Sequence, residues 1–100
     1  AEVTICASNQ AARESTLQAI VDKTGATFIH PYDNDEVITG QATCVKEMIE
    51  ALPDLEIVVT PVGGGGLLAG VALGLERNNL SHIPIFALET TGAASYLDAK

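Results

Sequence analysis

The sequence predicts an α/β fold of three layers, in which helices pack on a mostly parallel sheet of four strands. Stretches rich in β-branched residues alternate with stretches of helical periodicity along the 100 residues, an order typical of parallel sheets. The stretch LEIVVT at 55–60 is apolar on both faces, as expected of a strand buried between two helical layers. Four consecutive glycines then precede the next helical stretch, at the place where α/β sheets bind ligands.

The first strand is predicted over Glu2–Cys6, a short run rich in β-branched residues. A helix follows, because Ser8 or Asn9 can cap its amino end and Gly25 is a typical residue at a helix carboxyl end. The apolar residues of this helix fall on one face, which would pack on the sheet. They are Leu17, Ile20 and Val21.

The second strand is predicted over Ala26–His30 and ends at Pro31. A second helix would start at Asn34 or Asp35, and Pro53 would break it. Its apolar face carries Ile38, Val45, Ile49 and Leu52. Residues 1–100 would form one partial α/β unit, and the turn at 31–34 is the best candidate for a joint between two of its sub-layers.

The third strand is predicted over Leu55–Thr60, the third helix over Gly66–Arg77 and the fourth strand over Ile85–Leu88. Gly70 and Gly74 share one face of the third helix, where they would let it approach a neighbour closely. Three helices do not suffice to cover both faces of a four-stranded parallel sheet. We therefore expect exposed apolar surface, which further chain or a partner would cover.

The composition excludes several classes of partner. The formal net charge is −8 at pH 7 and the five basic residues are scattered, so no basic patch for nucleic acid can be drawn. Cys6 and Cys44 lie in apolar runs without a CxxC motif, which favours buried thiols over a disulfide or a zinc site. The first ten residues lack the regions of a signal peptide, so a reducing cytoplasm or organelle interior is expected.

A membrane span is an alternative for the central stretch. From Ile57 to Leu75, nineteen residues carry no charge, which is close to spanning length. Pro61 and Gly63–Gly66 fall near the middle, where lipid would leave the backbone without hydrogen-bond partners. A strand, a loop and a helix of a soluble domain are therefore the better interpretation.

The glycines Gly63–Gly66 predict a phosphate site. A helix start offers unpaired N–H groups and a partial positive charge, and glycine lets successive amides curl around an anion. A P-loop is excluded because no GK[ST] follows. A dinucleotide site stays open, since Gly64, Gly66 and Ala69 satisfy the loose GxGxxG/A pattern. Glu89, twenty-three positions past Gly66, lies roughly where a ribose-binding acid is found.

Residues 60–70, TPVGGGGLLAG, resemble the tetraglycine loop of the fold-type II pyridoxal-phosphate enzymes, most closely that of the serine and threonine dehydratases and serine racemase. Residues 25–43, GATFIHPYDNDEVITGQAT, resemble the stretch that these enzymes carry upstream of the loop. Residues 85–96, IFALETTGAASY, resemble the stretch downstream. The order and spacing agree over nearly the whole chain, so the resemblance favours pyridoxal phosphate over a dinucleotide.

The resemblance implies a role for each glycine of the loop. Gly63, Gly64, Gly65 and Gly66 would donate backbone N–H groups to the cofactor phosphate, and Leu67 would complete the loop. Gly70 and Gly74 are interpreted as structural.

The resemblance also implies a cation site at Glu89, Ala93 and Ser95. Its ligands would be a carboxylate, a backbone carbonyl and an oxygen side chain, a set that suits a hard monovalent or divalent cation. Racemase-like members have Asp at the position of Ser95, so the serine fits the dehydratase-like branch, where potassium is the usual ion. Tyr32 matches a position near the mouth of the cleft.

The reaction that the resemblance implies is a pyridoxal-phosphate-dependent ammonia-lyase reaction, which converts L-serine or L-threonine to pyruvate or 2-oxobutanoate and ammonia. A serine or threonine racemase on the same scaffold and a non-catalytic α/β fragment are the alternatives. The family is several-fold longer than this chain. Its expected partners are therefore a small amino-acid substrate, the rest of the enzyme chain and further copies in a homo-oligomer, with neither nucleic acid nor membrane.

No catalytic residue is predicted within these 100 residues. The family's Ser-x-Lys motif, whose lysine binds the cofactor covalently, is not found here, and Lys23, Lys46 and Lys100 lie in other contexts. The asparagine loop for the substrate carboxylate and the Ser or Cys for the ring nitrogen are also missing. The chain alone is expected to be inactive.

Overall fold

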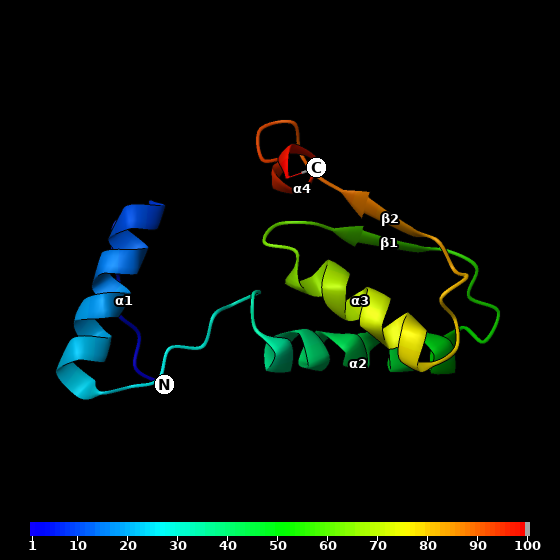
Figure 1. The fold of residues 1–100 in the computed structure, drawn as a ribbon, viewed down its shortest axis with the longest axis horizontal. Coiled ribbons are helices and arrows are strands. Elements are labelled where there is room, and N and C mark those ends of the chain that lie inside the picture. Colours follow the sequence, from blue (N-terminus) through cyan, green and yellow to red (C-terminus); the bar gives the residue numbers. More distant parts are fainter. Residues whose placement is uncertain (100) are drawn as a thin grey trace.

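The computed structural model describes residues 1–99, which form four helices and two strands. Figure 1 shows how they are arranged. The elements are α1 (Gln10–Thr24), α2 (Asp35–Ala51), β1 (Val58–Pro61), α3 (Gly66–Arg77), β2 (Ile85–Leu88) and α4 (Ser95–Asp98). The strands β1 and β2 with α3 between them form one βαβ unit, so the chain has the α/β class that the sequence predicts.

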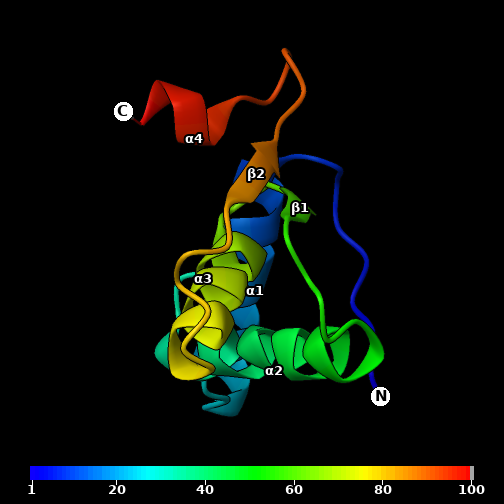
Figure 2. The same cartoon turned by 90° about the vertical axis from the view of Figure 1, so that its right-hand side faces the viewer.

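The two strands form a parallel pair. Val58 lies opposite Ile85, and Pro61 lies opposite Leu88. A parallel pair requires a crossover between its strands, because both must run in the same direction. The helix α3 is that crossover, and Figures 1 and 2 show the sheet, α3 and α2 following one another in space.

The core lies between the sheet and the two helices that follow it in space. Its buried residues come from α2, β1, α3 and the turn before β2: Val45, Val58, Val71, Leu75 and Ile83. The helices approach closely because α3 presents glycine to α2. A Cβ on Gly70 would lie 2.5 Å from the Gln41 Cβ, and one on Gly74 would lie 2.7 Å from the Ala42 carbonyl oxygen. The structural interpretation of both glycines therefore has a steric basis.

The helix ends follow the predicted capping residues. The Asn9 side chain accepts a hydrogen bond from the Ala12 amide at 2.8 Å, and α1 ends at Gly25 with φ of 70°. The Asn34 side chain accepts from the Val37 amide at 3.0 Å and begins α2. Local side-chain hydrogen bonds thus fix the starts of both helices, independently of tertiary packing.

The predicted sheet of four strands is wrong for the described residues, where only two strands pair. Glu2–Cys6 and Ala26–His30 are not assigned as strands and flank α1. Figure 1 shows α1 apart from the other helices and the sheet, and none of its side chains is buried. A helix satisfies its backbone internally, whereas a strand needs a neighbouring edge, so α1 forms there and the two strands do not.

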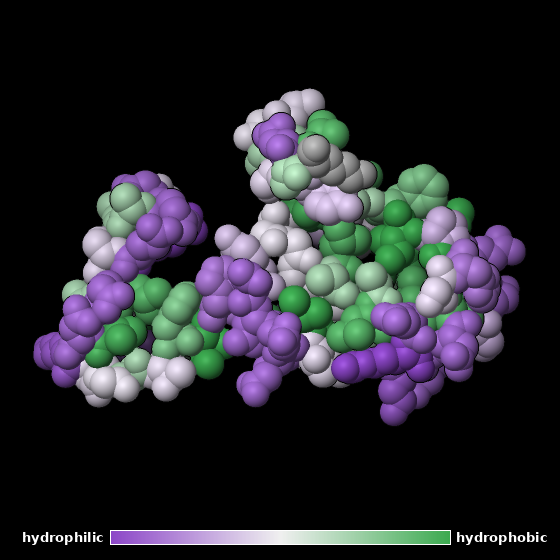
Figure 3. All heavy atoms as spheres, in the orientation of Figure 1, coloured by the Kyte–Doolittle hydropathy of each residue, from purple (hydrophilic) through white to green (hydrophobic). Residues whose placement is uncertain are grey.

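The sheet is covered on one face only, so the third predicted layer is missing from residues 1–99. Val59 and Phe86 lie opposite each other on the uncovered face and are 59% and 54% exposed. Leu88 is 58% exposed. These exposed side chains confirm the expected exposed apolar surface. In the view of Figure 3, further hydrophobic residues gather at the surface around the strands and α3.

Within the part of the chain that the structure describes, no helix combines the length and the apolar content that crossing a bilayer requires. The uncharged stretch 57–75 instead forms β1, the glycine loop and most of α3.

Candidate functional site

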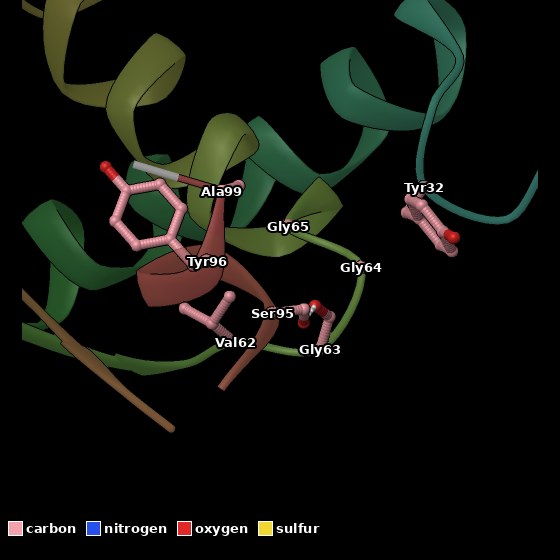
Figure 4. Close-up of a pocket in the computed structure, with 8 residues that line it drawn as sticks. All are labelled: Tyr32, Val62, Gly63, Gly64, Gly65, Ser95, Tyr96 and Ala99. Carbon is pink, nitrogen blue, oxygen red and sulfur yellow. Dashed lines mark hydrogen bonds between the residues drawn. The ribbon is translucent and has the colours of Figure 1, made fainter. Parts of the chain in front are cut away.

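The glycine loop lies just beyond the carboxyl end of β1. The Val62 amide donates to the Leu88 carbonyl at 2.9 Å, which extends the strand pairing up to the first glycine. A cavity of about 410 Å³ opens beside the loop. Figure 4 shows its lining, which comes from Tyr32, Val62, Gly63, Gly64, Gly65, Ser95, Tyr96 and Ala99. No charged side chain is among these lining residues.

The loop offers a row of backbone donors. Within residues 1–99, the amides of Gly63 to Leu67 have no hydrogen-bond acceptor in the protein. The Gly65 carbonyl already accepts from the Ala69 amide at 2.9 Å, which starts the helical hydrogen bonding. Gly65 has φ of 92°, in the left-handed region, and is the N-cap of α3. A left-handed residue at a helix start turns neighbouring N–H groups toward a common point, which suits an anion.

Three of the four glycines are required, for three different reasons. A Cβ on Gly64 would overlap ring atoms of Tyr32. A Cβ on Gly66 would lie 2.9 Å from the Tyr32 Cα. Gly65 needs its positive φ, whereas a Cβ on Gly63 would meet open space. The geometry therefore fits a loop whose backbone is exposed to a bound phosphate, because side chains are excluded from it.

Leu67 takes a different place from the glycines. Its side chain is partly buried and packs against the core cluster, and it does not line the cavity. Only the backbone N–H of Leu67 is available to a ligand, so any role of this residue in phosphate binding would come from the amide alone.

The predicted cation residues belong to the segment after β2. The Glu89 carboxylate accepts from the Tyr96 amide at 2.7 Å and from the Leu97 amide at 3.0 Å. Both oxygens of Glu89 thus hold the start of α4. The Ser95 hydroxyl donates to the Gly63 carbonyl at 3.2 Å, as Figure 4 shows. The Ala93 amide donates to the Thr90 carbonyl at 3.0 Å, which leaves the Ala93 carbonyl as its possible ligand atom.

Ser95 therefore joins the two candidate sites. It belongs to the predicted cation set, and it also lines the cavity and contacts the glycine loop. The described residues contain no cluster of three or more His, Cys, Asp or Glu side chains that would hold a metal. A cation at this place would depend on the mixed set of carboxylate, carbonyl and hydroxyl oxygens.

Sequence patterns alone did not assign the aromatic walls of the cavity. Tyr32 precedes α2 and Tyr96 lies in α4, so neither belongs to the glycine motif. For Tyr32, the family resemblance gave the only indication in the sequence, because it matched this residue to the mouth of the cleft. His30, the last residue of the predicted second strand, has its Nδ1 accepting a hydrogen bond from the Asp33 amide at 2.8 Å.

The chain is similar to known proteins over its whole length. The whole chain, residues 1–100, matches the family described as pyridoxal-phosphate dependent enzyme. The serine racemase of Dictyostelium discoideum is 41% identical over 93 residues, 93% of this chain and 28% of that protein. The L-threonine ammonia-lyase of Thermotoga maritima is 42% identical over 78 residues, 78% of this chain and 19% of that protein.

A solved structure of maize serine racemase also resembles the chain. The TM-score is 0.79 at 36% identity, over 88% of this chain and 27% of that one. The chain belongs to the fold-type II family of pyridoxal-phosphate-dependent enzymes. It spans about a quarter of the length of these relatives.

Proposed function

We propose that this chain is the phosphate-binding segment of a pyridoxal-phosphate-dependent ammonia-lyase that acts on L-serine or L-threonine. The complete enzyme that would contain it is called the parent enzyme below. One observation carries the proposal: a row of amides at the start of α3 has no acceptor among residues 1–99, in a loop where Tyr32 leaves no space for a side chain at Gly64 and Gly66.

In this proposal the amides of Gly63, Gly64, Gly65, Gly66 and Leu67 bind the cofactor phosphate. They orient the cofactor relative to the sheet, because α3 and β1 fix both ends of the loop. Among residues 1–99 no Lys or Arg lines the cavity. In this proposal the described residues hold the phosphate with neutral donors and the positive end of α3 rather than with an ion pair. When bound, pyridoxal phosphate supplies the electron sink that the reaction requires.

We also propose that Glu89, Ala93 and Ser95 bind a cation, for which potassium is the first choice. Two of these residues already form hydrogen bonds around the site. Glu89 holds the start of α4, and Ser95 contacts the glycine loop at Gly63. An ion there would neutralise the Glu89 carboxylate near the cavity and stiffen the segment that carries Ser95.

A racemase of serine or threonine is the second candidate. It is supported by the two serine racemases among the relatives described above, one of them 41% identical to this chain. Ser95 favours the ammonia-lyase, because the resemblance places Asp at this position in racemase-like members. The remaining partners would be the rest of the enzyme chain and further copies of it in a cytoplasmic homo-oligomer.

The test is an assay of the purified parent enzyme with L-serine and with L-threonine. We expect formation of pyruvate or 2-oxobutanoate to exceed formation of the D-amino acid, and to depend on added potassium. Predominant formation of D-serine or D-threonine would favour the racemase. A parent enzyme that binds no pyridoxal phosphate would contradict both candidates.

A further inference from the structure

We propose that Tyr32 is a positioning residue that holds the phosphate loop in its binding shape. The inference rests on the proposed function and adds a residue outside the glycine motif. Tyr32 precedes α2 and lies 31 positions before Gly63, yet it contacts the loop at two of its four glycines. Figure 4 shows Tyr32 next to Gly64, on the far side of the loop from Tyr96.

The contact between Tyr32 and the loop is too close for any side chain on the glycines. The Cγ, Cδ1 and Cε1 atoms of the ring occupy the space that a Cβ on Gly64 would need. The Tyr32 Cα and Cβ lie 2.9 Å from where a Cβ on Gly66 would be. The ring and its backbone therefore form a wall against the loop, and this wall blocks displacement of Gly64 toward Tyr32.

The wall is itself fixed from both sides. His30 Nδ1 accepts from the Asp33 amide at 2.8 Å and from the Tyr32 amide at 3.4 Å. The His30 and Tyr32 rings meet edge to face with centroids 4.5 Å apart. On the other side, Asn34 caps α2, and α2 packs closely on α3. The phosphate loop leads directly into α3, and Tyr32 leads directly into α2. The packing of α2 on α3 therefore fixes the position of Tyr32 relative to Gly64.

Packing, and not hydrogen bonding, carries this role. Among the described residues, the Tyr32 hydroxyl has no hydrogen-bond partner. The ring also lines a second cavity of about 440 Å³, together with Phe28 and His30. Tyr32 thus separates the phosphate cavity from this neighbouring one. Phenylalanine in place of Tyr32 should therefore keep the wall against the loop, whereas alanine would remove it.

The experiment compares two cofactor forms on the parent enzyme freed of cofactor. Pyridoxal phosphate and pyridoxal, which lacks the phosphate, are each titrated by absorbance into the original enzyme, Tyr32→Phe and Tyr32→Ala. We expect Tyr32→Phe to bind both as the original does. We expect Tyr32→Ala to bind pyridoxal phosphate at least tenfold more weakly, a loss of about 1.4 kcal/mol, and pyridoxal unchanged. Gly40→Ala, at a site with open space around its Cβ, is the control.

A second arm tests the contact itself. Gly64→Ala should weaken pyridoxal phosphate binding strongly, because its methyl group would overlap the Tyr32 ring. Adding Tyr32→Ala should recover part of that loss, because it removes the ring atoms that the methyl group meets. Equal binding of pyridoxal phosphate by Tyr32→Ala and the original would overturn the inference. Equal losses for both cofactor forms would also overturn it, since the role would then be structural only. An original enzyme that binds pyridoxal phosphate no better than pyridoxal would instead refute the proposed function.

Discussion

At the scale of single residues, the four glycines of the loop have different tasks. Gly65 is the only one with positive φ, while Gly64 and Gly66 are constrained by Tyr32. Gly63 is constrained by neither, although its carbonyl accepts from Ser95. The run of glycines predicted a phosphate site at this loop, and the family resemblance supplied pyridoxal phosphate as its ligand. The sequence did not predict that the four glycines are constrained differently, because the constraint on Gly64 and Gly66 comes from Tyr32, which lies in a distant segment of the sequence.

Gly65→Ala should impair the parent enzyme more than Gly63→Ala does. An L-residue in the left-handed region costs about 1–2 kcal/mol, which corresponds to roughly a five- to thirtyfold weaker binding of the phosphate if the cost falls on the bound shape. At Gly63 no overlap and no positive φ oppose the new methyl group. The check is the dissociation constant of pyridoxal phosphate for both variants. Equal losses would show that backbone strain does not decide the loop geometry.

Glu89 combines a structural task with the proposed ionic one, and two substitutions separate them. Glu89→Gln keeps an oxygen that can accept from Tyr96 or Leu97 but loses the charge, whereas Glu89→Ala loses both. We expect both variants of the parent enzyme to lose activation by potassium. Glu89→Ala should speed hydrogen exchange at the amides of both Tyr96 and Leu97, whereas Glu89→Gln should speed it at only one of them, because glutamine keeps one acceptor oxygen. If Glu89→Gln retained its potassium response, the carboxylate would not be a cation ligand.

At the scale of the elements, helices were predicted better than strands. The predicted Gly66–Arg77 and Ile85–Leu88 agree with α3 and β2 as observed, and Asn9 and Asn34 cap the helices as predicted. Helix signals are local, since caps and periodicity lie within the segment itself. Glu2–Cys6 and Ala26–His30 have strand composition but form no strand. The pairing of a strand depends on an edge that its own sequence does not supply.

The contact between α2 and α3 provides the test at this scale. Gly70→Ala and Gly74→Ala should each destabilise the parent enzyme by about 1–3 kcal/mol, because the methyl group would overlap α2. Gly40→Ala, within α2 but facing open space, should stabilise it by about 0.5–1 kcal/mol through helix propensity. Urea unfolding of the cofactor-free parent measures all three. A stabilising Gly70→Ala would mean that the two helices are not in close contact.

At the scale of the whole molecule, the chain is an incomplete α/β arrangement. The strands of a parallel sheet are normally buried on both faces, whereas β1 and β2 are covered by α3 and α2 on one face only. The sequence predicted this exposure from the shortage of helices relative to the expected strands. It overestimated the sheet, because two expected strands lie beside α1 and lack a partner. The relatives are about three to four times as long as this chain, so further chain can supply the missing strands and layer.

The uncovered face gives a direct prediction for the 100-residue chain studied alone. Val59 and Phe86 lie opposite each other on this face, and both are more than half exposed. We expect the chain to bind a hydrophobic dye and to self-associate with increasing concentration, since large exposed apolar patches favour association. Val59→Thr combined with Phe86→Thr should reduce both effects, because threonine suits a strand but is polar.

The matched control for this pair lies on the opposite face of the same strand. Val58 is 5% exposed and belongs to the core cluster. Val58→Thr should leave the exposed patch intact while burying a hydroxyl, at a cost of about 1–3 kcal/mol. Dye binding, measured by fluorescence, should therefore stay high or rise in Val58→Thr and fall in the double variant. Self-association, measured by sedimentation, should follow the same order. If the unmodified chain were a monomer that unfolds in one cooperative step without binding dye, its outer sheet face would be covered in solution. The two-layer arrangement of residues 1–99 would then need a third layer supplied from within the chain.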